Sequence, residues 1–271
     1  MLKGVNAWVF PGEFTVDDTL EAGARVGYDG VELNIDEAKL DPYKVTRGEC
    51  KRIAEKAGSL GIELPSICGG LFWKYNLGGL DETVRKKGVD LIRKGCEFAS
   101  NLGAKVLLVV PAVATPQVPY KEMWERSKKA VLEAAPAAED YGVYIGVENV
   151  WNRFLYSPLE FKAFLKDVNH DYVKAYFDAG NVLFLGFPQH WIEVLATDIV
   201  CVHVKDFNME KREFRHLLQG DVPWKEVVSA LSRVGYDYFL NLEVGPIPGD
   251  PLKAASENKR ALDEILSIRR N

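Results

Sequence analysis

One repeated phrase constrains this chain more than any other feature: a helical segment, a glycine, and then a short apolar strand. It occurs in RVGYDGVEL, SLGIEL, NLGAKVLL, DYGVYIGV and RVGYDYFL. Each glycine stands just past a stretch with helical spacing, where a left-handed residue can end a helix without steric cost. The β-branched and aromatic residues that follow are typical of a strand. The chain is therefore expected to alternate helices and strands along its length.

Eight strand–helix pairs can be placed by hydrophobic periodicity. The predicted strands cover about residues 4–10, 30–35, 62–68, 105–111, 144–150, 173–178, 199–205 and 238–244. The predicted helices cover about residues 15–26, 44–60, 81–102, 120–141, 157–168, 188–197, 222–234 and 251–269. Because no Pro/Gly/Ser-rich linker interrupts the series, we predict one α/β domain over residues 1–271, a closed (β/α)8 TIM barrel. A doubly wound open sheet is the competing architecture.

Composition excludes several classes of protein. The chain has 271 residues, 47% of them hydrophobic, which is enough to bury the core of one barrel. Its net charge of −5 argues against a nucleic-acid-binding surface. No apolar run reaches the length of a membrane span and no signal peptide is recognisable, so we expect a soluble cytoplasmic protein with no membrane partner. The cysteines are widely scattered and indicate buried free thiols: Cys50, Cys68, Cys96 and Cys201.

Four polar side chains lie near the carboxyl ends of consecutive predicted strands. They are Glu148 in YIGVENV, Asp178 in KAYFDAGN, His203 in IVCVHVKD and Glu243 in FLNLEVG. The two-residue period of a strand turns all four inward, and barrel active sites gather at these strand ends. Singly, each is more often a cap, an ion-pair partner or a hydrogen-bonded core residue. Together, three interior carboxylates would be costly without a cation, so the pattern predicts a divalent metal site for Mn(II), Co(II), Mg(II) or also Zn(II).

Five motifs then carry a family resemblance over essentially the whole chain. GYDGVELN, ENVWNRF, FDAGNV, VHVKDF and GYDYFLNLEVG resemble, in order, motifs of the xylose-isomerase-like TIM barrel superfamily. The similarity is to its sugar and sugar-phosphate isomerase/epimerase branch, which contains ketose 3-epimerases of the D-tagatose, L-ribulose-5-phosphate and L-xylulose-5-phosphate types. The resemblance implies a metal-dependent isomerase acting on a ketose or ketose phosphate, assembled as a homodimer or homotetramer.

The resemblance also implies roles for individual residues. Glu148, Asp178, His203 and Glu243 would bind the ion, and Glu148 and Glu243 would act as the acid/base pair. C3 epimerisation would then proceed by removing and returning a proton through a metal-stabilised enediolate. Four further residues are candidates for substrate binding: Asn181, Arg215, Trp73 and Glu32.

Each of these four has a structural alternative, as a loop, capping or interior polar residue. Lys205 and Asp206 either orient substrate or pair with each other. The resemblance departs after Asn152-Arg153-Phe154, where free-ketose epimerases often carry a glutamate and this chain has Leu155.

Other functions remain open on the same site. An inosose isomerase or dehydratase, or another aldose–ketose isomerase, would use nearly the same proton chemistry. A non-catalytic sugar-binding barrel is the alternative from another class. A trinuclear zinc endonuclease is disfavoured, because such a site needs several more histidines than His170, His190, His203 and His216 provide.

Overall fold

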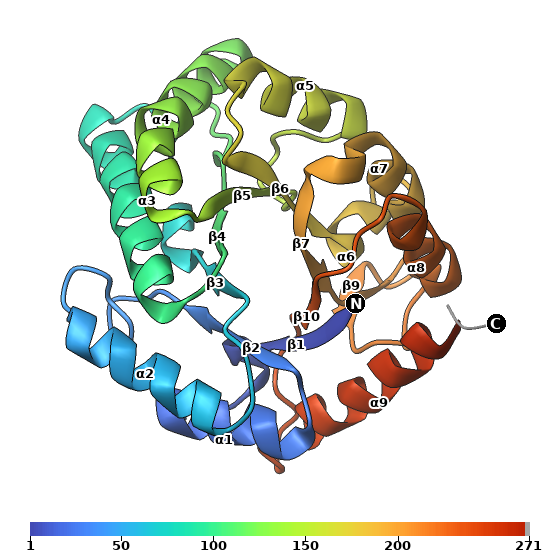
Figure 1. Cartoon of the computed structure of the whole chain (residues 1–271). Helices are drawn as coiled ribbons and strands as arrows, with labels where there is room; N and C mark the ends of the chain where they lie inside the picture. The colour runs from blue at the N-terminus through green and yellow to red at the C-terminus, as the bar shows by residue number, and fades with distance from the viewer. Residues whose placement is uncertain (269–271) are drawn as a thin grey trace.

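The computed structural model describes residues 1–268 and forms a closed parallel barrel ringed by helices (Figure 1). The strand order around the barrel is β1-β10-β7-β6-β5-β4-β3-β2. The predicted (β/α)8 TIM barrel is confirmed. Its strands are β1 Leu2–Asn6, β2 Gly30–Asn34, β3 Ser66–Cys68, β4 Val106–Val109, β5 Tyr144–Glu148, β6 Val173–Asp178, β7 Ile199–Val204 and β10 Phe239–Leu242.

The helices form the outer layer of Figure 1, and several of them begin or end at residues typical of helix caps. Thr15 and Thr46 each make a capping box at a helix start, and Gly103 ends α3 in the left-handed conformation at φ 80°. The longer helices are α1 Val16–Val26, α2 Arg47–Ser59, α3 Glu82–Leu102, α4 Tyr120–Tyr141, α5 Pro158–Val168, α7 Pro188–Leu195, α8 Trp224–Arg233 and α9 Lys253–Ser267. In the described part of the chain, no helix is long and apolar enough to cross a membrane.

The structure differs from the predicted elements at both ends of the first strand and after two later strands. The strand predicted at 4–10 begins at Leu2 and ends at Asn6, whose side chain accepts a hydrogen bond from Trp8 N (2.8 Å) and turns the chain into a short 3-10 helix. The prediction had no counterpart for α6 (Ala179–Leu183), which follows β6 directly. The predicted end of the last helix, residue 269, lies outside the described residues.

A two-stranded antiparallel ribbon, β8 (Asp206–Asn208) with β9 (Glu213–Arg215), was also unpredicted. Asp206, the first residue of the ribbon, is fully buried and anchors the ribbon to the barrel. The Asp206 carboxylate accepts hydrogen bonds from Trp224 Nε1 and from Val222 N, both at 3.0 Å. Asp206 therefore joins the start of the ribbon to the segment that leads into α8, and it does not pair with Lys205.

The interior of the barrel is polar beneath its carboxyl-terminal end. Asn241 Nδ2 donates to Tyr176 Oη (2.8 Å) and to Ser66 Oγ (2.9 Å), and all three residues are fully buried. In strand register His203 lies beside Asp178 on one side and Asn241 on the other. This register brings the ends of β5, β6, β7 and β10 to one level. The four cysteines are free and buried within the described residues, as predicted.

Candidate metal centre

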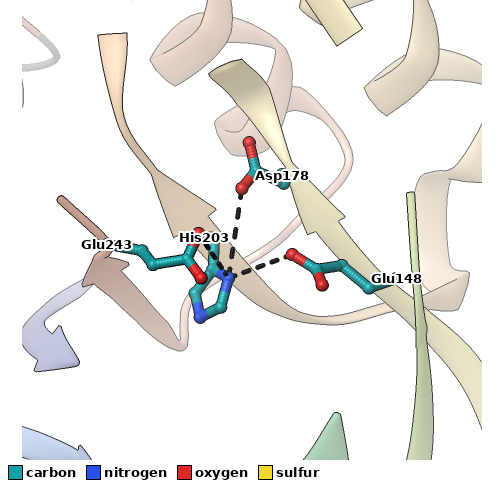
Figure 2. A group of neighbouring side chains, drawn as sticks. All are labelled: Glu148, Asp178, His203 and Glu243. Atoms are coloured by element: carbon teal, nitrogen blue, oxygen red, sulfur yellow. Dashed lines mark hydrogen bonds and ion pairs between the residues drawn. The ribbon is translucent and has the colours of Figure 1, made fainter. Parts of the chain in front are cut away.

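The four predicted ligand residues converge at the carboxyl end of the barrel (Figure 2). Glu148 and Asp178 are the last residues of β5 and β6, His203 is the penultimate residue of β7, and Glu243 directly follows β10. One potential ligand atom from each side chain lies within 4.8 Å of the others. Strand pairing therefore produces the cluster that the sequence periodicity indicated.

Contacts on both sides of its ring set the orientation of His203. Its Nδ1 faces the carboxylates, at 3.1 Å from Glu148 Oε1, 3.6 Å from Glu243 Oε2 and 4.0 Å from Asp178 Oδ2. On the opposite side, Nε2 lies 2.6 Å from Glu32 Oε2. A proton on Nε2 donated to Glu32 leaves the Nδ1 lone pair directed at the cluster, as a metal-binding histidine requires.

Glu32 lies below His203 inside the barrel and is fully buried. Besides His203, its carboxylate accepts hydrogen bonds from Asn6 Nδ2 (2.6 Å), Ser66 Oγ (2.7 Å) and Tyr176 Oη (2.6 Å). It is not among the residues that line the cavity above the cluster. This placement favours a role in orienting His203 over the predicted contact with substrate.

Lys205 brings a positive charge into the same cluster. Its ammonium lies 2.8 Å from Asp178 Oδ2, contacts Glu243 Oε2, and stands 4.8 Å from the centre of the Phe214 ring. The lysine stem passes so close to Gly180 that a Cβ there would lie 2.6 Å from Lys205 Cγ. Gly180, in the DAGN segment, therefore permits Lys205 to reach the two carboxylates.

Burial and mutual repulsion perturb the protonation of the cluster. Burial raises the pKa of Glu148 to about 7, and the Glu243 and Asp178 carboxylates act in the same direction against His203. Burial also raises the pKa of Asp178, although the Lys205 ammonium opposes that shift. For His203, burial disfavours the charged ring, but Glu32 and Glu243 outweigh it and raise its pKa. These carboxylates compete for protons in the absence of another cation.

The residues present fit a divalent ion. Asp178 Oδ1 accepts a hydrogen bond from Asn181 N (2.7 Å), whereas the buried Oδ2 has no hydrogen bond within residues 1–268 and makes only ionic contacts. One imidazole nitrogen and three carboxylates form a donor set suited to Mn(II), Co(II), Mg(II) or Zn(II). Glu148, Asp178, His203 and Glu243 would hold the ion.

A cavity of about 300 Å³ opens above the cluster and reaches Glu148, Glu243 and Lys205. Two of the predicted substrate-binding residues, Trp73 and Asn181, line it. Arg215 does not, because it lies in β9 and pairs with Glu213. The structure therefore leaves both Glu32 and Arg215 outside the cavity wall.

Sequence reasoning missed three aromatic residues of the wall: Trp8, Trp151 and Phe214. Trp151 donates from Nε1 to Asn181 O (2.8 Å) and packs 4.8 Å from the Phe214 ring, centre to centre. Trp151 lies within the ENVWNRF motif and Trp8 just after the first strand. Their positions next to strand ends, where barrel active sites form, were the sequence signal that could have identified them.

Comparison with known proteins agrees with this architecture. A 28% identical relative from Methanocaldococcus jannaschii, the uncharacterised protein MJ1311, aligns over 99% of this chain and 90% of its own length. L-ribulose-5-phosphate 3-epimerase UlaE of Escherichia coli is 23% identical, over 81% of this chain and 78% of its own. The crystal structure of a D-tagatose 3-epimerase-like protein superposes with a TM-score of 0.84 at 25% identity, covering 99% of this chain and 98% of that one. The family model for the xylose isomerase-like TIM barrel matches residues 20–265, and the chain belongs to this family.

Proposed function

We propose that this protein is a divalent-metal-dependent carbohydrate isomerase that epimerises a ketose at C3. One observation carries the proposal: two glutamates, Glu148 and Glu243, reach the same cavity from either side of His203 and Asp178 (Figure 2). The epimerase activity named for the relative UlaE supports this assignment.

The two glutamates are suited to moving one proton between two faces of a sugar carbon. Glu148 comes from β5 and Glu243 from the end of β10, with β6 and β7 between them in the barrel. A C3–H bond between them would lose its proton to one carboxylate and regain a proton from the other, which inverts C3. Which glutamate acts first depends on the configuration of the substrate.

The neighbouring residues support this transfer. A divalent ion bound in the cluster would supply positive charge beside the carbonyl oxygen, where negative charge develops as the proton leaves. Glu32 holds His203 in the orientation that such an ion requires, and Lys205 keeps a positive charge beside Glu243. The aromatic side chains of the cavity wall would shield the proton being moved from water once a sugar is bound between them.

The test is proton exchange at the sugar. The protein is stripped of metal, reloaded with Mn(II) or Mg(II), and incubated in D2O with ketoses, ketose phosphates, aldoses and inososes, and the products are followed by NMR. Deuterium at C3 with inversion is the expected result. Deuterium at the carbon next to an aldehyde would instead establish an aldose–ketose isomerase, and loss of water an inosose dehydratase.

Binding without exchange across the panel would indicate the non-catalytic sugar-binding barrel and overturn the proposal. The identity of the metal, the cytoplasmic location and the homodimer or homotetramer stay predictions.

A further inference from the structure

From the walls of the cavity we infer that the substrate is an uncharged, unphosphorylated sugar held between aromatic side chains. The inference rests on the proposed function and narrows its substrate class. It chooses between free ketoses and ketose phosphates, a choice that the relatives do not decide, since UlaE is named for a sugar phosphate.

The first argument is the charge around the cavity. Three carboxylates, Glu148, Asp178 and Glu243, face one ammonium, Lys205, so their formal charges sum to minus two. A divalent ion brings that sum to zero. A phosphate group would add a charge of about −1.5 to −2 at neutral pH, with no excess positive charge to receive it.

The second argument is that Lys205 and the two arginines of the ribbon segment already have partners. Lys205 is the cationic side chain in the cavity wall formed by the described residues, and its ammonium is occupied by two carboxylates. Two arginines on the ribbon segment lie outside the wall. Arg215 pairs with Glu213, and Arg212 lies 5.6 Å above the Phe184 ring. Phosphate sites normally present such cations, or several backbone N–H groups, directly to the ligand.

The third argument is the aromatic character of the walls. Trp8 and Trp73 belong to short 3-10 helices that follow β1 and β3, whereas Trp151 follows β5 and Phe214 lies in β9 of the ribbon after β7. The three tryptophans and Phe214 remain between 43% and 46% exposed, so their ring surfaces are open to a ligand. The C–H faces of a neutral sugar pack against such rings, while its hydroxyls reach the polar floor.

Contacts within the protein hold both of these walls in place. Trp151 is held by its hydrogen bond to Asn181 O and by edge contact with Phe207, 5.3 Å between ring centres. On the other side, Trp8 packs against Gly70, where a Cβ would lie 3.3 Å from the indole. The cavity volume of about 300 Å³ lies at the small end of ligand sites and suits a single monosaccharide.

The experiment compares matched pairs, such as ribulose with ribulose 5-phosphate and fructose with fructose 6-phosphate, on the metal-loaded protein. Both binding, from tryptophan fluorescence or calorimetry, and kcat/KM for deuterium exchange are measured. We expect the free sugar of the preferred pair to exceed its phosphate by on the order of 100-fold in both quantities. Tighter binding or faster exchange of the phosphate would overturn the inference, and so would failure of both members to bind.

The two readouts separate this inference from the proposed function. Free sugars that bind but do not exchange would end the epimerase assignment and leave the substrate class standing. Exchange confined to sugar phosphates would leave the epimerase assignment standing and end the inference about the substrate class.

Variants add a second test. Trp73→Leu should raise the Kd for the free sugar roughly threefold to tenfold by loss of ring contact. Tyr141→Leu, which removes a comparably exposed ring (41%) at the far end of α4, should leave that Kd unchanged. Arg212→Gln should not alter the affinity for the phosphate. A selective loss of phosphate binding in Arg212→Gln would contradict the inference.

Discussion

Glu32→Gln changes the charge beneath His203 with almost no change in shape. The Glu32 carboxylate receives four hydrogen bonds, two on each oxygen: Asn6 Nδ2 and His203 Nε2 on Oε2, Ser66 and Tyr176 hydroxyls on Oε1. A glutamine amide can keep its oxygen toward His203 and turn its NH2 toward the hydroxyls, which can rotate to accept. The histidine then keeps its contact but loses a charged acceptor.

The expected magnitude follows from those contacts. A hydrogen bond to a charged group contributes about 1.5–3 kcal/mol and a neutral one about 0.5–1.5 kcal/mol. Each of the four bonds would weaken by about 1–1.5 kcal/mol, and relief from burying a charge offsets part of that sum, so Glu32→Gln should cost the metal-free protein about 2–4 kcal/mol. The less firmly held His203 should lower metal affinity about 10–100-fold. Glu32→Leu removes all four acceptors and should cost about 3–5 kcal/mol or more, because the buried donors lose their partners.

The assay is Mn(II) affinity by electron paramagnetic resonance, together with denaturant unfolding in chelator. Glu37→Gln is the matched control, since Glu37 follows the same strand but is exposed and pairs with Lys74. It should leave metal affinity unchanged. A Glu32→Gln protein that unfolds like its parent and binds Mn(II) with the parent Kd would refute the claim that Glu32 orients His203.

Three further predictions concern the cluster itself. Glu148→Gln and Glu243→Gln, each checked for retained metal, should lower deuterium exchange at least about 100-fold, and parental turnover in either would exclude that glutamate as a proton carrier. Lys205→Met should destabilise the metal-free protein by about 3–5 kcal/mol, because it leaves the negative charges of Asp178 and Glu243 uncompensated. The same substitution should tighten Mn(II) binding, because it removes a cation that competes with the metal. Weaker Mn(II) binding would contradict this prediction. Burial raises the pKa of Glu148 to about 7 in the metal-free fold, so the folded protein holds this proton more tightly than the unfolded chain does. The resulting stabilisation is fully present below the unfolded pKa near 4.5 and is lost as the pH rises through 7. Mn(II) binding requires the ionised carboxylate, so affinity should fall about tenfold per pH unit below 7, and a Kd independent of pH there would show that Glu148 does not ligate.

The positions of the four clustered side chains, which are candidate metal ligands, could be predicted from sequence because they depend on short-range rules. A two-residue period fixes which side of a strand Asp178 and His203 occupy, and the barrel topology brings the strand ends together. The alternation of glycine-ended helices with short strands predicted that topology in the same way.

The remaining features depend on loops and on contacts between distant strands. Glu32 contacts His203 across the barrel interior, 171 residues away in sequence, so its inward position alone did not distinguish it from a substrate ligand. Arg215 followed the seventh strand as a substrate arginine would, but the ribbon turns it toward Glu213. Sequence periodicity ends where the strands end, and the ribbon and the aromatic wall begin beyond that point.

Asp206 has a consequence for how this protein could be re-engineered. Asp206 starts the ribbon, and its carboxylate accepts hydrogen bonds from Val222 N and Trp224 Nε1 near the start of α8. It therefore joins the two ends of the segment between β7 and α8. The intervening stretch, residues 207–221, could therefore be exchanged as a unit between these two attachment points, provided that Gly220 is kept, because a Cβ there would collide with the Asp206 carboxylate. Exchanging residues 207–221 between relatives would transfer the Phe214 side of the cavity to another protein and leave the four clustered side chains of the candidate metal centre unchanged.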